Sequence, residues 1–247
     1  VRAASRARCL LDDAHALIQP AIGGFAAFDA LLAFARDHAD GVLWVLTLDA
    51  SVWPLLKRAR DARPLFDETY LLGGWSESQI GALLQERCAR AALLPSYEDL
   101  LEPLPPSADE QDRQDALLAK RTGYERMLWD HVGGNPALAL EVWRSSLAQD
   151  AAGVVHVRAL QVPDPTLLEK LPDASLFILR AVLQFAPISA EAVAQATRLR
   201  PEEVLQDLRF GRAQGFFEEH QGEVRVAWRW LRAATRLLER RHLLVTP

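Results

Sequence analysis

The stretch Cys9-Leu10-Leu11-Asp12-Asp13-Ala14-His15 decides the fold that this sequence of 247 residues predicts. A short apolar run that begins after Arg8 ends there in two adjacent carboxylic acids. Such a run is typical of a buried strand that carries acidic side chains to its C-terminal edge. Alternatively, Asp12-Asp13 only turns the strand into a helix, as a capping pair does. The residues alone leave both interpretations open.

Helical and strand-like segments alternate after this stretch. Residues 24–38 repeat apolar side chains at helical spacing. Residues 42–46 form a continuous apolar run, which fits a strand covered on both faces of a parallel sheet. Ser51 is expected to cap a helix over residues 51–62, and residues 68–72 read as a third short strand. The alternation predicts an α/β fold with a partial parallel sheet over residues 1–74.

Residues 75–150 change to an all-helical pattern. Ser76, with Gln79 three residues later, predicts a capping box at the start of a helix that ends near residue 92. The next stretch, residues 94–114, is rich in prolines and acids, which indicates a surface excursion. The remaining expected elements are helices over 115–131 and 137–147, separated by the turn Gly133-Gly134-Asn135-Pro136.

The last part of the chain has a different rhythm. Residues 151–172 are the expected linker, because a small apolar patch there is followed by two prolines. The elements expected next are helices over 174–186, 189–198 and 201–213, a hairpin that turns at Gln221-Gly222, and a basic amphipathic helix over 230–243. Three helices and a hairpin predict a winged-helix-like domain over residues 173–247.

Composition argues against several classes of function. The formal net charge of −5 offers no general attraction to nucleic acid or to an anionic membrane. Cys9 and Cys88 follow apolar spacing, which indicates a reducing, cytoplasmic compartment. No apolar run reaches the length of about 18 residues that predicts a membrane span. The sequence also has no Cys-x-x-Cys pair, no histidines at metal-ligand spacing and no Gly-x-Ser-x-Gly motif of a hydrolase.

The order of these segments resembles that of bacterial P-loop ATPases of the AAA+/STAND type. In that family, a strand that ends in two acids is the Walker B motif. The resemblance implies that Asp12 holds Mg²⁺, a hard ion that prefers carboxylate oxygen, and that Asp13 polarises the attacking water. Thr47 ends the next strand and matches the family's polar residue near the γ-phosphate, with Asp49 as the competing candidate. A β-branched residue that simply favours a strand end is the alternative for Thr47.

Two further motifs match the same family. The segment Arg63-Pro64-Leu65-Phe66 resembles the place where a subunit offers an arginine finger, so Arg63 is a candidate; a solvated basic helix face is the alternative. The turn before Pro136 resembles the Gly-x-Pro element of the helical lid, where the proline lies near the nucleotide. Ordinary helix punctuation explains that turn as well. The lid arginine of many AAA+ proteins has no close match, because Arg144 lies well down the helix.

One essential part of the family pattern does not occur in these residues. No Gly-x-x-x-x-Gly-Lys-Ser/Thr loop is present, and in the family that loop precedes Walker B. We therefore expect a fragment of a longer ATPase. Binding of ATP and Mg²⁺ and hydrolysis are expected only of the intact protein, and the fragment alone is expected to be inactive.

The sequence is compatible with three functions. The first is an ATP-driven conformational switch that acts on a protein partner or assembles with itself. The second is a DNA-binding transcriptional regulator, but the expected recognition helix carries three acids against two arginines, and phosphate neutralisation favours a basic helix. The third is a nucleotide-independent adaptor for protein interactions.

Overall fold

A computed structural model describes residues 7–60 and 64–245 of the chain. The described residues fall into two compact units. Unit 1 combines the residues up to Leu71 with those from Pro165 onward, and unit 2 covers Leu72–Asp164.

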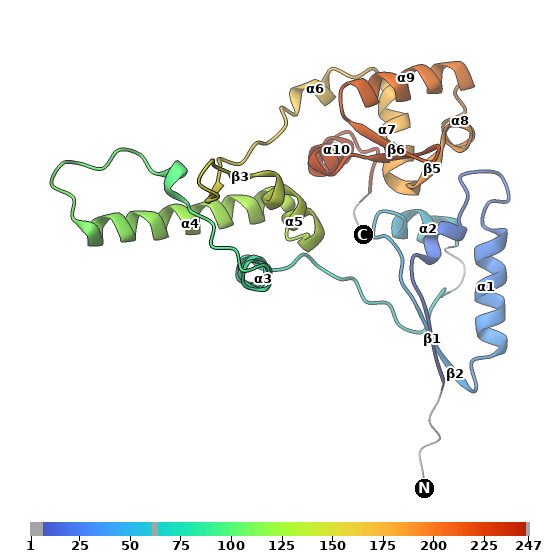
Figure 1. The fold of residues 1–247 in the computed structure, drawn as a ribbon. Helices are drawn as coiled ribbons and strands as arrows, with labels where there is room; N and C mark the ends of the chain where they lie inside the picture. The colour runs from blue at the N-terminus through green and yellow to red at the C-terminus, as the bar shows by residue number, and fades with distance from the viewer. Residues whose placement is uncertain (1–6, 61–63, 246–247) are drawn as a thin grey trace, which may run out of the picture. The chain divides into compact units, whose positions relative to one another are not determined.

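The first part of unit 1 is a two-stranded parallel sheet with a helix beside it. Its elements are β1 (Ala7–Leu11), the 3₁₀ helix η1 (Ala14–Leu17), α1 (Ala26–Asp37), β2 (Val42–Leu46) and α2 (Trp53–Ala59). In the ladder, Ala7 lies opposite Val42 and Leu11 opposite Leu46. Figure 1 shows α1 running alongside these strands. The predicted order of strand, helix, strand and helix is confirmed.

The sheet is covered on one face only, so the expectation of a strand buried on both faces is wrong for the described residues. Phe34 of α1 meets Trp44 of β2 edge to face, with the ring centroids 5.6 Å apart. On the opposite face, Leu10 is 70% exposed, Leu43 51% and Val45 39%. Side chains of a strand alternate between the two faces, and no described layer packs on the second one.

Two other local expectations are also wrong. Residues 68–72 form no strand, and Tyr70, Leu71 and Leu72 are exposed there because their backbone pairs with neither β1 nor β2. The helix α2 begins at Trp53, so Ser51 does not cap it. Instead, the N–H of Ser51 donates to the carboxylate of Asp49 over 2.8 Å, which closes the turn before the helix.

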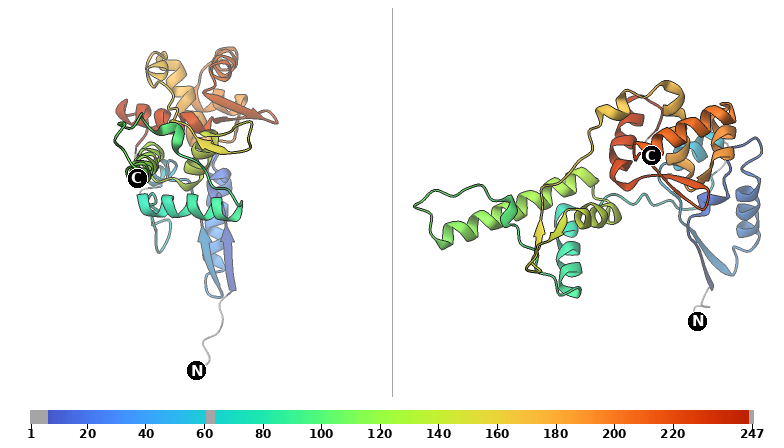
Figure 2. Two further views of the ribbon diagram at one scale, coloured as in Figure 1. Left: turned by 60° about the vertical axis from the view of Figure 1, so that its left-hand side comes forward. Right: turned by 45° about the horizontal axis from the view of Figure 1, so that its top comes forward.

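Unit 2 is mainly helical (Figure 2). Its elements are α3 (Glu77–Arg90), the 3₁₀ helix η2 (Glu98–Leu100), α4 (Glu110–Val132), α5 (Pro136–Ser145) and a hairpin of β3 (Leu147–Gln149) with β4 (Val155–Val157). The predicted capping box of Ser76 and Gln79 is present at the start of α3. The helix α4 begins before residue 115, because Asp109 caps it in a second box with Asp112. The stretch expected to be a linker, residues 151–172, includes β4.

The turn between α4 and α5 is built on two left-handed glycines. Gly133 has a φ of 60° and Gly134 one of 73°, values that side chains disfavour. Asn135 then caps α5 by accepting the N–H of Leu138 over 3.0 Å, and Pro136 takes the first helical position. The carbonyl of Gly134 also accepts the N–H of Trp75 over 2.8 Å. The turn is therefore fixed to the segment that leads into α3.

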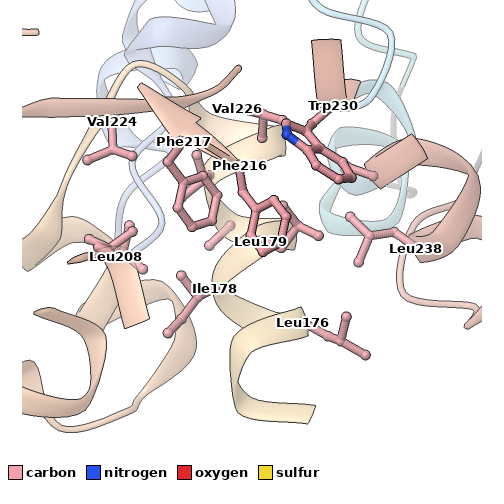
Figure 3. Close-up of a cluster of buried hydrophobic side chains, with 14 of the residues drawn as sticks. Leu176, Ile178, Leu179, Leu208, Phe216, Phe217, Val224, Val226, Trp230 and Leu238 are labelled. Carbon is pink, nitrogen blue, oxygen red and sulfur yellow. The ribbon is translucent and has the colours of Figure 1, made fainter. Parts of the chain in front are cut away.

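The second part of unit 1 follows the predicted rhythm of helices and a hairpin. Its elements are α6 (Thr166–Glu169), α7 (Asp173–Phe185), β5 (Ile188–Ser189), α8 (Ala190–Thr197), α9 (Pro201–Ala213), β6 (Phe217–His220), β7 (Glu223–Val226) and α10 (Trp228–Arg240). The strands form an antiparallel sheet in the order β5-β7-β6. Figure 3 shows the core, in which Phe216 meets Trp230 edge to face at 4.8 Å beside Leu179 and Leu238.

None of the helices described is both long and apolar enough to span a lipid bilayer.

The contact between Gly134 and Trp75 predicts a cost for any side chain at position 134. A Cβ there would lie 2.7 Å from the backbone nitrogen of Trp75, and the residue would keep its left-handed conformation. We expect Gly134→Ala to lower the free energy of unfolding by at least about 1–2 kcal/mol. Gly123→Ala, on α4, meets nothing within 4 Å and is expected to stabilise slightly. Urea unfolding followed by circular dichroism compares the two variants, and equal effects would contradict this account of the turn.

Burial of Tyr97 predicts an alkaline loss of stability. Burial raises the pKa of its phenol to about 12, with the Glu125 carboxylate acting in the same direction. Since the folded chain holds the neutral phenol, this contribution is complete below the unfolded pKa of about 10 and is lost as the pH rises toward 12. We expect Tyr97→Phe to flatten the decline in urea stability between pH 10 and 12. An unchanged slope would mean that Tyr97 is solvated in the folded chain.

Candidate functional site

The pairing of β1 and β2 continues beyond the last strand residues. The N–H of Thr47 donates to the carbonyl of Leu11 over 2.9 Å, and the N–H of Ala14 donates to the carbonyl of Thr47 over 2.9 Å. These bonds hold Asp12, Asp13 and Thr47 together at the carboxyl ends of two adjacent parallel strands. The structure therefore brings together the three residues that the sequence placed nearest to the chemistry.

Thr47 joins the two acids through its hydroxyl group. The hydroxyl donates to Oδ1 of Asp12 and accepts the N–H of Asp13 over 2.9 Å. The same N–H lies 3.2 Å from Oδ1 of Asp12. A hydroxyl that donates and accepts in this way fixes its own rotamer and the orientation of the Asp12 carboxylate. The second carboxylate oxygen of Asp12, which is an exposed residue, is left to solvent or to a ligand.

Asp13 has an exposed carboxylate, which does not cap the helix that follows it. Its φ of 51° and ψ of 38° are left-handed values, and its side chain makes no capping bond to η1. The side chain is 77% exposed. Asp13 therefore occupies the position of a cap without acting as one, so helix capping does not explain its carboxylate. An exposed carboxylate beside a fixed one is free to bind water.

His15 and Asp49 complete the cluster, and no sequence motif marks His15 as a site residue. The His15 side chain is only 14% exposed, and its Nδ1 lies 3.8 Å from Oδ1 of Asp13. The N–H of Asp49 donates to that Nδ1 over 3.3 Å, which requires the proton of a neutral ring to be on Nε2. The available signal was the position of a histidine three residues after Asp12, on the first turn of η1.

Asp12, Asp13, Asp49 and His15 lie near this edge of the sheet, and the Asp49 carboxylate is engaged by the N–H of Ser51. In the part of the chain that the structure describes, no three or more histidine, cysteine or acidic residues are placed to hold a metal ion. Mg²⁺ usually keeps several waters and binds through one or two carboxylates together with phosphate oxygens. Asp12 and Asp13 therefore form no metal cage of their own among the described residues.

The other predicted site residues lie elsewhere. Arg63 falls in residues 61–63, outside the described residues. Its neighbour Arg60 is bound to Asp29 of α1, with Nη2 2.5 Å from Oδ2, and this contact lowers the pKa of Asp29. Arg58 is exposed on α2. Pro136 belongs to unit 2, where it starts α5.

A cavity of about 820 Å³ lies in unit 1, away from the acids. Residues 18–25, α7 and α8 supply most of its lining, with Leu55 of α2. Asp12, Asp13 and Thr47 are not among the lining residues. Beside it, the side-chain amide of Gln184 on α7 donates to the carbonyl of Ser51 over 3.3 Å. Asp12, Asp13 and Thr47 are exposed at the end of the sheet.

Comparison with models of protein families, with curated proteins and with solved structures found no match.

The bridging role of Thr47 predicts a stability effect that depends on its hydroxyl alone. Thr47→Val keeps the shape and removes both hydrogen bonds, so we expect the free energy of unfolding to fall by about 1 kcal/mol. Thr47→Ser is expected to retain most of the stability. Thr69→Val, at an exposed position, is the matched control and is expected to stay within about 0.5 kcal/mol of the parent. Urea unfolding measures all three, and equal values for the two valine variants would show that the bridge contributes nothing.

Proposed function

We propose that this chain is part of an ATP-driven molecular switch of the AAA+/STAND type. In this proposal, Asp12, Asp13 and Thr47 form the part of its active site that holds Mg²⁺ and the attacking water. One observation supports the proposal above the others. Thr47 is hydrogen-bonded to Asp12 and to the N–H of Asp13 across the carboxyl ends of two parallel strands. In open α/β sheets, ligands bind outside the carboxyl ends of the strands.

The three residues divide the chemistry between them in this proposal. Asp12, whose orientation is fixed, binds Mg²⁺ directly or through water, and the ion neutralises charge on the phosphates. Asp13, whose carboxylate is exposed, orients and polarises the attacking water. Thr47 acts as a positioning residue, because its hydroxyl is already engaged by Asp12. To contact the γ-phosphate itself, that hydroxyl has to leave Asp12.

The proposed switch needs parts besides this edge. A phosphate-binding loop with its lysine is required, and the 247 residues contain none, so the proposal assigns it to residues outside this sequence. Unit 2 is proposed as the helical lid, with Pro136 at its nucleotide-facing turn. Helices α7–α9 with the β6–β7 hairpin are proposed as a winged helix that transmits the change, and Arg63 stays the candidate finger toward a neighbouring subunit.

Hydrolysis by the protein that carries the loop tests the proposal. We expect Asp13→Asn to lower kcat about 100-fold or more while ATP still binds, because general-base catalysis contributes about 10²–10⁴-fold. Asp12→Asn is expected to remove the Mg²⁺ dependence of ATP binding. Asp67→Asn, an exposed acid away from the strand ends, is the control with the same charge change and is expected to be neutral.

Turnover comes from a coupled phosphate-release assay, and binding from calorimetry with and without Mg²⁺. Unchanged hydrolysis by the Asp13→Asn protein would remove the assignment of Asp13. A gene product that has no phosphate-binding loop ahead of β1 would end the ATPase proposal and leave the nucleotide-independent adaptor in its place.

A further inference from the structure

The last helix, α10, carries a line of arginines on one face. Arg229, Arg232, Arg236 and Arg240 follow one another at spacings of three, four and four residues. At 100° per residue they fall within an arc of about 80°, and at 1.5 Å per residue they extend over about 16 Å. We refer to these four residues as the arginine stripe.

The apolar face of α10 is already used by the core of unit 1. Trp230, Ala234, Leu237 and Leu238 are all at least 97% buried, and Figure 3 shows Trp230 and Leu238 among the core side chains. The helix therefore has no free apolar face to insert into a lipid bilayer. It also lacks the apolar anchor beside its charges that protein interfaces usually bury at their centre. What α10 offers to a partner is positive charge.

Most of that charge is not neutralised within the part of the chain that the structure describes. Arg240 pairs with Glu169 at 2.7 Å. Arg229, Arg232 and Arg236 have no carboxylate within ion-pair distance among these residues, and the Nε of Arg232 is buried with no hydrogen-bond partner there. The one acid of α10, Glu239, makes no described ion pair with the stripe. By contrast, Arg212 and Arg225 around the hairpin are each paired with a glutamate.

We propose that the arginine stripe binds the phosphate backbone of duplex nucleic acid. Each strand of a duplex carries one phosphate per about 3.4 Å of helix axis, so a stripe about 16 Å long covers an axial length that holds about four phosphates of one strand. Guanidinium groups bind phosphate oxygens in a bidentate geometry. Phosphate contacts need charge and no apolar anchor, which is the combination that α10 presents.

This surface differs from the one that the sequence analysis considered for DNA. Helix α9, the expected recognition helix, presents the exposed Glu202 at its start, next to Glu203, which is half-buried and paired with Arg200. Acids at that end would repel phosphates and do not favour entry into a groove. Binding through α10 alone contacts the backbone, so it carries little sequence preference. The inference depends on α10 only and holds or fails independently of ATP hydrolysis.

Salt dependence of binding is the decisive measurement. The whole chain is titrated against a fluorescent 20-base-pair duplex, with binding followed by anisotropy between 50 and 200 mM salt. Each phosphate neutralised contributes a slope of about −0.9 to log K against log salt, so contacts from Arg229, Arg232 and Arg236 give about −2.7. Affinity should then fall about 40-fold over this range. A second duplex of scrambled sequence should bind equally.

Matched variants test whether the arginine stripe causes the salt dependence of binding. Arg229→Gln with Arg236→Gln changes two exposed side chains and should reduce the steepness of the slope by about two, whereas the two lysine replacements should keep it. Arg87→Gln with Arg126→Gln makes the same charge change on unit 2 and should leave binding unaffected.

Three results would overturn the proposal. The first is no binding to the duplex at 50 mM salt, and the second is equal slopes for the two glutamine pairs. The third is stronger arginine-dependent binding to polyglutamate or to vesicles containing phosphatidylserine than to DNA, which would make an acidic protein or a membrane surface the partner.

Discussion

The hydrogen bonds that extend the β1–β2 ladder past the ends of both strands fix the positions of Asp12, Asp13 and Thr47 relative to one another. Thr47 takes part in every step: its backbone binds Leu11 and Ala14, and its hydroxyl binds Asp12 and the N–H of Asp13. Without that register, two adjacent acids after a strand would be an ordinary exposed turn. With it, one carboxylate is oriented and the other is left to solvent. The different roles proposed for Asp12 and Asp13 rest on this difference.

The parts of the fold that were predictable are those fixed by local chemistry. Ser76 with Gln79 opens α3, and Gly133 ends α4, because caps and left-handed glycines act within a few residues of chain. The pairing of β1 with β2 followed from the α/β alternation, which demands neighbouring parallel strands. Asp109 was missed as a cap because the acids around it are equally plausible solvent-exposed side chains, and its box with Asp112 sets the start of α4.

What could not be predicted depends on partners distant in sequence. Residues 68–72 have the composition of a strand, but a strand exists only when another backbone accepts its hydrogen bonds, and β1 and β2 do not. The burial of His15 depends on its bond to Asp49, which lies 34 residues later. The ion pair of Arg60 with Asp29 likewise joins the end of α2 to α1, across 31 residues of sequence. None of these contacts can be predicted from the local sequence or the composition.

The uncovered face of the parallel sheet also bears on how the chain behaves in solution. Leu10, Leu43 and Val45 form an apolar strip next to two strand edges whose backbone groups pair with no described strand. Protein surfaces of this kind lower colloidal stability, because identical molecules find the same strip and edge on one another. The net charge of −5 opposes such encounters at low ionic strength, and added salt screens that repulsion. Handling of the isolated chain will therefore depend on the concentration of electrolyte.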